Sequence, residues 1–208
     1  EGNPYFYGLS SHENVEIKLY NKANPLKPWK TMGRMHDKYL IADGKIYILG
    51  GRNTYNYFLG DFPGHKNFDR DVLVVCDEPQ EENSVNQLLE YFETIWEQED
   101  CSYFHNSKKL ADRKSVKNAV LELQEGYQQY FDDNKERLCD TDYADETFET
   151  EKITLLSNPI HTGSKEPVVW YQLGELMKNA KECVKIHTPY IICNDMMYNT
   201  WEEIAQKV

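Results

Sequence analysis

The chain lacks several features that mark special classes of protein. Its five cysteines form no CxxC pair, and the odd count favours free thiols in a reducing compartment over a disulfide framework. No apolar run approaches the roughly 20 residues that a membrane-spanning helix needs. The opening EGNPYFYGLS has neither the basic flank nor the apolar stretch of a signal peptide. These absences predict a domain that faces the cytosol, with any membrane anchor outside these residues.

Positive charge is also scarce. The 23 Lys and Arg residues against 35 Asp and Glu residues give a formal net charge of −12. Such a balance argues against a nucleic-acid groove or a polybasic membrane patch as the dominant surface, while a small local basic pocket stays open. The 208 residues, 40% hydrophobic and 28% charged, are typical of a globular protein with one good core or two small ones.

Short apolar runs with turn signals between them predict strands in the first half. Period-two alternation predicts strands over 14–20, 38–42 and 45–49, and the dipeptide Asp43-Gly44 predicts a hairpin between the last two. The run 71–76 is almost uniformly apolar, which is typical of a strand buried on both faces. A Pro-punctuated loop, NKANPLKPWKTMGR, joins the first strand to the hairpin.

Helical periodicity begins after the turn Asp77-Glu78-Pro79. Apolar residues at helical spacing over 85–96 predict an amphipathic helix, and a second helical stretch covers 108–131. The acidic segment 139–151 is most simply a solvated linker. Beyond it the pattern predicts strand, helix, strand, helix over 153–156, 168–180, 183–192 and 196–206. The fold class is therefore α/β.

One stretch, residues 34–53, combines chemistry-bearing side chains at fixed spacing. It follows the pattern H-x-K-x4-D-x6-G-G-x-N, with His36, Lys38, Asp43, Gly50, Gly51 and Asn53 at the fixed positions. In extended chain, residues two apart share a face, so the first two can meet one phosphate. An imidazole can attack phosphorus, an ammonium offsets the charge of the oxygens, and an amide can donate a hydrogen bond. The two glycines allow backbone to come close to a phosphate.

This pattern resembles the signature of the phospholipase D superfamily, and the wording HDKYLIAD…GGRNTYNYFLGD is most similar to the first motif of bacterial cardiolipin synthases. The resemblance implies a mixed sheet flanked by helices, built twice, with one motif from each copy at a shared site. It covers about residues 14–100 and 152–208. A second motif is not present, and Glu78 stands where the family has Gly before Pro79. The implied domains are the C-terminal part of a first repeat (1–100), a helical and acidic connector (101–151) and an incomplete second repeat (152–208).

The resemblance also implies roles for single residues. His36 is the nucleophile or its partner acid, and the sequence does not decide between them. Asp71 falls at the aspartate that orients the histidine, with Asp69 as the fallback and a plain strand-entry residue as the alternative. Asp43 belongs to the motif, but its distance along the hairpin favours a role in the turn. Arg52 either pairs with a lipid phosphate or caps the turn.

Four aromatic residues follow the motif. Such residues more commonly pack in the core, and the alternative is that they line an acyl-chain or headgroup channel. They are Tyr55, Tyr57, Phe58 and Phe62.

The implied activity is that of a phosphatidyltransferase. A phosphatidyl group passes from one phospholipid to a phosphohistidine and then to the glycerol hydroxyl of phosphatidylglycerol, and no metal or organic cofactor is implied. Phospholipids are the expected substrates, and the expected place is the cytoplasmic side of a membrane, contacted through regions outside this chain. Two alternatives stay open: a phosphodiesterase of the same superfamily that uses water, and a catalytically silent phosphate-binding module. Net acidity disfavours nucleic acid, and exposed sheet edges favour a homodimer.

Overall fold

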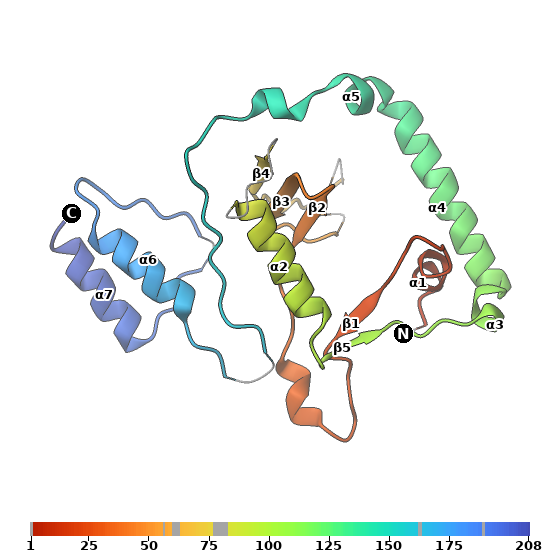
Figure 1. Cartoon of the computed structure of the whole chain (residues 1–208), viewed down its shortest axis with the longest axis horizontal. Coiled ribbons are helices and arrows are strands. Elements are labelled where there is room, and N and C mark those ends of the chain that lie inside the picture. Colours follow the sequence, from red (N-terminus) through yellow and green to blue (C-terminus); the bar gives the residue numbers. More distant parts are fainter. Residues whose placement is uncertain (1, 56, 60–62, 77–82, 162–163, 189) are drawn as a thin grey trace. The chain divides into compact units, whose positions relative to one another are not determined.

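The computed structural model describes residues 2–55, 57–59, 63–76, 83–161, 164–188 and 190–208. It shows a mixed α/β chain (Figure 1) that divides into two compact units, Glu1–Leu155 and Leu156–Val208. The strands are β1 (Lys18–Tyr20), β2 (Tyr39–Ala42), β3 (Ile46–Gly50), β4 (Asp71–Val75) and β5 (Cys101–Tyr103). The helices of the first unit are α1 (Pro4–Leu9), η1 (Pro28–Met32), α2 (Ser84–Trp96), α3 (Lys108–Ala111), α4 (Lys114–Asp133), α5 (Lys135–Asp140) and η2 (Tyr143–Glu146).

Strands β2, β3 and β4 form a three-stranded antiparallel sheet in that order. The predicted hairpin is confirmed: Asp43 and Gly44 have φ of 53° and 65°, and positive φ at both central positions is what a type I′ turn requires. The Lys45 N–H donates to the Ala42 carbonyl at 3.0 Å and closes the turn. The turn Asp77-Glu78-Pro79 expected after β4 lies outside the described residues.

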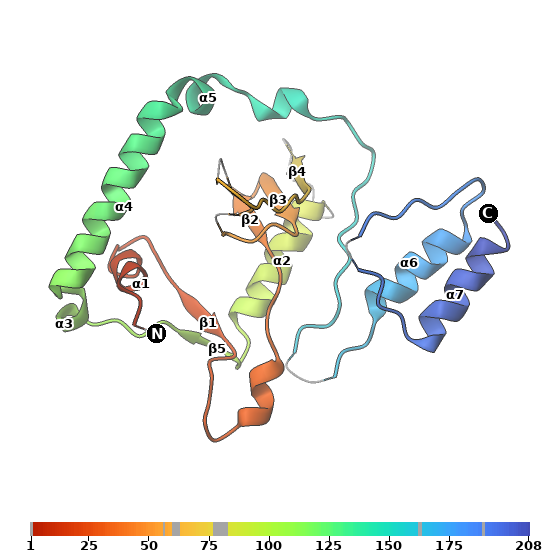
Figure 2. The ribbon, with the colours of Figure 1, turned by 180° about the vertical axis from the view of Figure 1, so that it is seen from behind.

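Helix α2 covers one face of this sheet (Figures 1 and 2). The side chain of Asn83 accepts a hydrogen bond from the Asn86 N–H at 2.8 Å, so a polar residue caps the start of the helix. The buried core joins sheet and helix, and it consists of Tyr47, Val74, Val85 and Leu88. The Tyr47 hydroxyl donates to Ser84 Oγ at 3.1 Å, which satisfies the buried phenol.

The opposite face of the sheet carries apolar side chains that no described element covers. Register pairs Leu40 with Ile48 and Ile48 with Leu73 across the sheet, and Leu40 is 60% exposed. Strand β4 is an edge strand, and on its other face, which it shares with the buried Val74, Val72 is 60% exposed as well. The prediction that 71–76 is buried on both faces is therefore wrong. Apolar composition alone does not supply a second layer over a strand.

Strands β1 and β5 form a second, two-stranded antiparallel sheet, with Leu19 opposite Ser102. The strand predicted over 14–20 is thus formed only at its end, where β5 is a partner. The Lys18 ammonium donates to the Trp96 carbonyl at 2.5 Å and lies 4.7 Å from the centre of that indole ring. A cation at this place stabilises the C-terminal end of α2. The described strands pair only antiparallel, which differs from the expected mixed sheet.

The helical stretch predicted over 108–131 is present as two helices, α3 and α4. Helix α3 ends before Asp112, whose N–H donates to the Lys108 carbonyl at 2.9 Å. Helix α4 packs against α1 at a close approach, because a Cβ at Gly8 would lie 2.9 Å from a methyl group of Val120. The acidic segment that follows is mostly exposed.

The second unit contains two helices, α6 (Val168–Lys178) and α7 (Asp195–Ala205), both predicted. The rings of Trp170 and Trp201 lie 5.8 Å apart between the helices, and Lys178 pairs with Glu203 at 3.1 Å. The strands predicted over 153–156 and 183–192 are wrong, since no strand is formed in the described part of 152–208. A strand needs a neighbour for its backbone hydrogen bonds, and neither segment has one there.

Candidate functional site

The two halves of the H-x-K…G-G-x-N pattern meet at one end of the β2–β3 hairpin. Tyr39 pairs with Leu49, and the Gly50 N–H donates to the Lys38 carbonyl at 3.2 Å. The pairing extends the hairpin by one step, so the segment that enters β2 and the segment that leaves β3 lie next to each other. Asp43 is at the turn, five residues beyond Lys38, which corresponds to about 16 Å of extended chain.

Helix α2 positions the segment that enters β2. The Tyr91 hydroxyl donates to Asp37 Oδ2 at 2.6 Å, and the rings of Tyr39 and Tyr91 lie 6.2 Å apart, edge to face. Asp37 and Tyr39 therefore point toward the helix. Lys38, which lies between them, takes the opposite side, where Leu40 lies as well. No sequence signal identified Tyr91, because one tyrosine in an amphipathic helix does not reveal which strand it faces.

Gly50 and Gly51 admit two aspartates into close contact with the backbone. Gly50 lies opposite Asp71 in the β3–β4 ladder, and a Cβ at Gly50 would lie 1.9 Å from Asp71 Oδ1 and 2.9 Å from its Cα. A Cβ at Gly51 would lie 2.8 Å from Asp69 Oδ1. No larger residue fits at Gly50 without moving β4. The role that the sequence suggested for the glycines, approach to a phosphate, stays a prediction.

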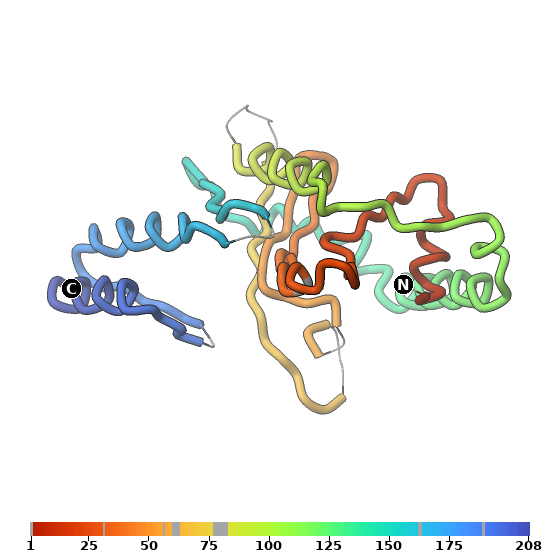
Figure 3. Tube along the Cα trace, turned by 90° about the horizontal axis from the view of Figure 1, so that it is seen from below, coloured from red at the N-terminus to blue at the C-terminus, as the bar shows by residue number. Residues whose placement is uncertain are grey.

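Arg52 fixes the loop between β3 and β4. This loop extends well away from the sheet (Figure 3). Its Nε donates to Asp71 Oδ2 at 2.6 Å, its Nη1 to the Phe58 carbonyl at 2.7 Å and its Nη2 to the Asp69 carbonyl at 2.9 Å. Both ends of the loop are thereby fixed to one guanidinium. Of the two roles left open for Arg52, pairing with a lipid phosphate and structural capping, these contacts favour the structural one.

Asp71 has one oxygen engaged and one available. Its Oδ2 accepts from Arg52, while its Oδ1 is buried and has no hydrogen-bond partner in the part of the chain that the structure describes. Because Oδ1 points along the Cβ direction of Gly50, it lies on the sheet face that Lys38 shares. A buried carboxylate oxygen of this kind is an acceptor that still needs a donor. No described contact joins Asp71 to His36.

The remaining motif side chains are accessible. His36 is exposed, Asn53 is half-buried, and the Lys38 ammonium donates to the His36 carbonyl. The three residues lie on the two segments that meet at this hairpin end, and an imidazole, an ammonium and a carboxamide are chemically suited to supply a nucleophile or acid together with two donors for phosphate oxygens.

The two tyrosines after the motif are not part of the core. Tyr55 and Tyr57 are exposed, with ring centres 4.5 Å apart. Phe58 is half-buried, and its carbonyl accepts the hydrogen bond from Arg52. Phe62 lies outside the described residues. The prediction that the aromatic residues pack in the core is therefore wrong for the two tyrosines.

Burial beside α2 raises the pKa of two phenols next to the motif. Burial raises the pKa of Tyr39 to about 12, and the Asp37 charge acts in the same direction. Burial also raises the pKa of Tyr91, as does its hydrogen bond to Asp37. Both phenols are therefore neutral over the physiological range, and the Tyr91 hydroxyl keeps the proton that it donates to Asp37.

Neither a metal cluster nor a membrane-spanning helix is found among the described residues. No three His, Cys, Asp or Glu side chains there gather closely enough to hold a metal ion. None of the described helices combines the length and the apolar character that crossing a bilayer requires.

Comparisons with known proteins do not assign the chain to a family. No protein-family profile matches the chain, and no solved structure matches it. Over 131 aligned residues the chain is 30% identical to an uncharacterized protein of Helicobacter pylori (strain J99 / ATCC 700824). The alignment covers 55% of this chain and 23% of that protein. The chain thus spans less than a quarter of the length of that relative.

Proposed function

We propose that this chain carries the first phosphohistidine motif of a phospholipase D superfamily phosphatidyltransferase, similar to a cardiolipin synthase. One observation supports this best: the Gly50 N–H donates to the Lys38 carbonyl at 3.2 Å, which brings the H-x-K segment and the G-G-x-N segment together. A hairpin whose polar face is merely solvent-exposed does not require an imidazole, an ammonium and a carboxamide on the segments at one end.

In the proposed reaction, an imidazole nitrogen forms a bond to phosphorus while the bond from phosphorus to the first alcohol breaks. His36 provides either that nitrogen or the proton for the leaving oxygen, and a second motif provides the other function. Lys38 and Asn53 bind the non-bridging oxygens, whose charge grows in the transition state. The glycerol hydroxyl of a second phosphatidylglycerol then takes the phosphatidyl group and releases the imidazole.

Asp71 is the proposed acceptor for the far nitrogen of the histidine. Its buried Oδ1 needs a donor, and an imidazole N–H held by a carboxylate directs the other nitrogen at the substrate. Arg52 holds the second carboxylate oxygen of Asp71 in place. Asp43 supports the turn of the hairpin in this proposal rather than the chemistry, because it lies at the opposite end of the strands.

The test uses the full-length protein and vesicles of phosphatidylglycerol. Wild type, His36→Asn and the exposed control His105→Asn are incubated with the vesicles, and the lipid products are separated by mass. We expect cardiolipin and glycerol from wild type and from the control, and a loss of at least about a thousandfold in His36→Asn. Phosphatidic acid without cardiolipin would assign hydrolysis instead. Turnover that does not depend on His36 would remove the residue from the mechanism.

A further inference from the structure

The loop before the motif concentrates positive charge in an acidic protein. Residues 21–36 contain four basic residues and no Asp or Glu, although the whole chain has a formal charge of −12. The four basic residues are Lys22, Lys27, Lys30 and Arg34. We call residues 21–34 the basic loop. A local excess of positive charge is complementary to an anionic surface.

The same loop presents large apolar side chains to solvent. Leu26 is 84% exposed, Trp29 73% and Met32 86%. Trp29 and Met32 belong to η1, the short orange coil below β1 and β5 in Figure 1. Segments that lie in the interface of a bilayer typically combine lysines with exposed apolar side chains, among them tryptophan.

The inner side of the loop is fixed to the first unit. Asn21, at a positive φ of 45°, donates from Nδ2 to the Lys30 carbonyl at 2.6 Å and to the Gly33 carbonyl at 2.5 Å. Its own N–H donates to the Asp100 carbonyl at 2.7 Å. Lys30 pairs with the Asp100 carboxylate at 3.2 Å. The loop therefore presents its apolar tips in a defined conformation, which lowers the entropic cost of docking.

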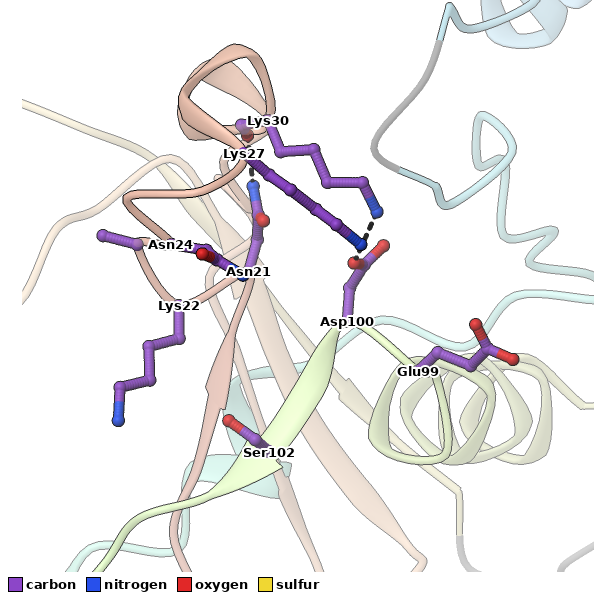
Figure 4. Close-up of a pocket in the computed structure, with 9 residues that line it drawn as sticks. Asn21, Lys22, Asn24, Lys27, Lys30, Glu99, Asp100 and Ser102 are labelled. Atoms are coloured by element: carbon purple, nitrogen blue, oxygen red, sulfur yellow. Dashed lines mark hydrogen bonds and ion pairs between the residues drawn. The ribbon is translucent and has the colours of Figure 1, made fainter.

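A polar pocket lies beneath the lysines (Figure 4). It encloses about 180 Å³, and its wall holds the lysines Lys22, Lys27 and Lys30, the carboxylates of Glu99 and Asp100, and the polar residues Asn21, Asn24 and Ser102. Figure 4 shows the Lys27 and Lys30 side chains reaching over the pocket toward Asp100. The mixture of ammonium groups with hydroxyl and carboxylate acceptors suits a phosphate that carries hydroxyl groups.

We propose that the basic loop docks the protein on an anionic phospholipid surface, with Leu26, Trp29 and Met32 in the interface and the lysines on lipid phosphates. Docking here places a membrane contact inside this chain, directly before His36. The inference extends the proposed function and rests on it for the link to catalysis. The charge of the loop selects a bilayer rather than an apolar protein partner, because anionic headgroups match the lysines while acyl chains match the exposed tips.

The test is vesicle binding by the full-length protein, measured by co-sedimentation. Vesicles of phosphatidylcholine with about one third phosphatidylglycerol are compared with vesicles of phosphatidylcholine alone. We expect binding to the anionic vesicles that weakens as salt is added. The variant Leu26→Ser/Trp29→Ser should bind on the order of tenfold more weakly, because two apolar side chains no longer enter the interface. The control Phe148→Ser removes an equally exposed side chain, 94% accessible, from the acidic segment and should bind like wild type.

A second pair of variants separates charge from apolar contact. Lys22→Gln/Lys27→Gln should lose about fivefold in affinity per lysine at low salt, whereas Lys108→Gln/Lys109→Gln on α3 should change it little. Wild-type protein that fails to bind anionic vesicles, or loop variants that bind like their controls, would overturn the inference. Capture of protein or nucleic acid by the loop without lipid binding would also overturn it.

Binding and turnover are measured separately, so the two proposals can fail independently. His36→Asn should sediment with anionic vesicles like wild type, since docking needs no chemistry. Docking without lipid turnover would leave the basic loop as proposed and reject the phosphatidyltransferase. If wild type turns over detergent-dispersed phosphatidylglycerol but does not bind vesicles, the phosphatidyltransferase proposal stands and the docking proposal is rejected.

Discussion

Residues 38–75 and residues 183–192 both contain short apolar runs that favour extended chain, but their structures differ. In the first region, β2, β3 and β4 pair in sequence order and α2 covers one face. In the second, the described residues are irregular, with Ile191 and Ile192 exposed to solvent. The comparison shows that an apolar run becomes a strand where another segment supplies a partner, as the turn at Asp43-Gly44 does for β2 and β3.

The two regions also differ in what their polar residues do. In the first region, polar residues lie around Gly50: Asp71 accepts a hydrogen bond from Arg52, and the Lys38 carbonyl accepts one from the Gly50 N–H. The second leaves His187 on exposed chain. A functional site needs side chains fixed by packing and hydrogen bonds, and only the first region supplies them.

The largest effect on stability is expected at Gly50, where β4 approaches β3 closely. Gly50→Ala should lower the free energy of unfolding by about 3 kcal/mol, because the new Cβ would overlap the Asp71 side chain and lie 2.9 Å from its Cα. The control is Gly126→Ala within α4, where a Cβ would meet no atom within 4 Å, and it should gain about 0.5–1 kcal/mol. Urea unfolding measures both. Similar small effects at the two positions would show that β3 and β4 do not approach as described.

The next prediction tests the contrast between the regions directly. Val74→Ala should cost about 2 kcal/mol, because Val74 is buried between the sheet and α2. Ile192→Ala should change stability by less than about 0.5 kcal/mol, since that side chain is 87% exposed. Both variants are followed by urea unfolding. A large cost at Ile192 would mean that its segment packs into a sheet after all.

A smaller effect is expected at Arg52. Arg52→Ala removes the hydrogen bonds to Asp71 and to the Phe58 and Asp69 carbonyls, and it should cost about 1–2 kcal/mol. Lys117→Ala is the control, because it breaks an exposed ion pair with Asp112 worth at most about 0.5 kcal/mol. Proteolysis of the loop 52–70 gives a second measurement, and we expect faster cleavage in Arg52→Ala. Equal effects of the two variants would remove Arg52 as the support of the loop.

The smallest effect concerns alkaline pH. Burial raises the pKa of Tyr39 from 10 to about 12, so the folded state keeps the phenol neutral where the unfolded state ionises it. The stabilisation that this provides is complete below pH 10 and is lost as the pH rises through the folded value of about 12. Tyr39→Phe should therefore reduce the decline of the urea midpoint between pH 10 and pH 12. An unchanged slope in Tyr39→Phe would contradict the burial.

Local sequence predicted the elements that depend on neighbours along the chain. The Asp43-Gly44 turn, helix α2 and the two helices of the second unit were predicted from residues within one turn or one helix. The failures lie where a distant partner decides, at the uncovered face of β4, at the absent strands of 152–208 and at β5, which pairs with β1 across the sequence. Pairing of this kind depends on loop closure and packing, which a local pattern does not contain.

The candidate site divides in the same way. The sequence by itself determined the spacing of His36, Lys38 and Asn53 and predicted the hairpin that lies between them. Only the tertiary structure decided that Arg52 binds Asp71, that Gly50 makes room for that carboxylate, that Tyr91 positions Asp37, and that the basic loop presents its apolar tips to solvent. The physical reason is that spacing along a strand sets which residues share a face, whereas the contact made by each atom depends on strands and helices brought together from distant parts of the chain.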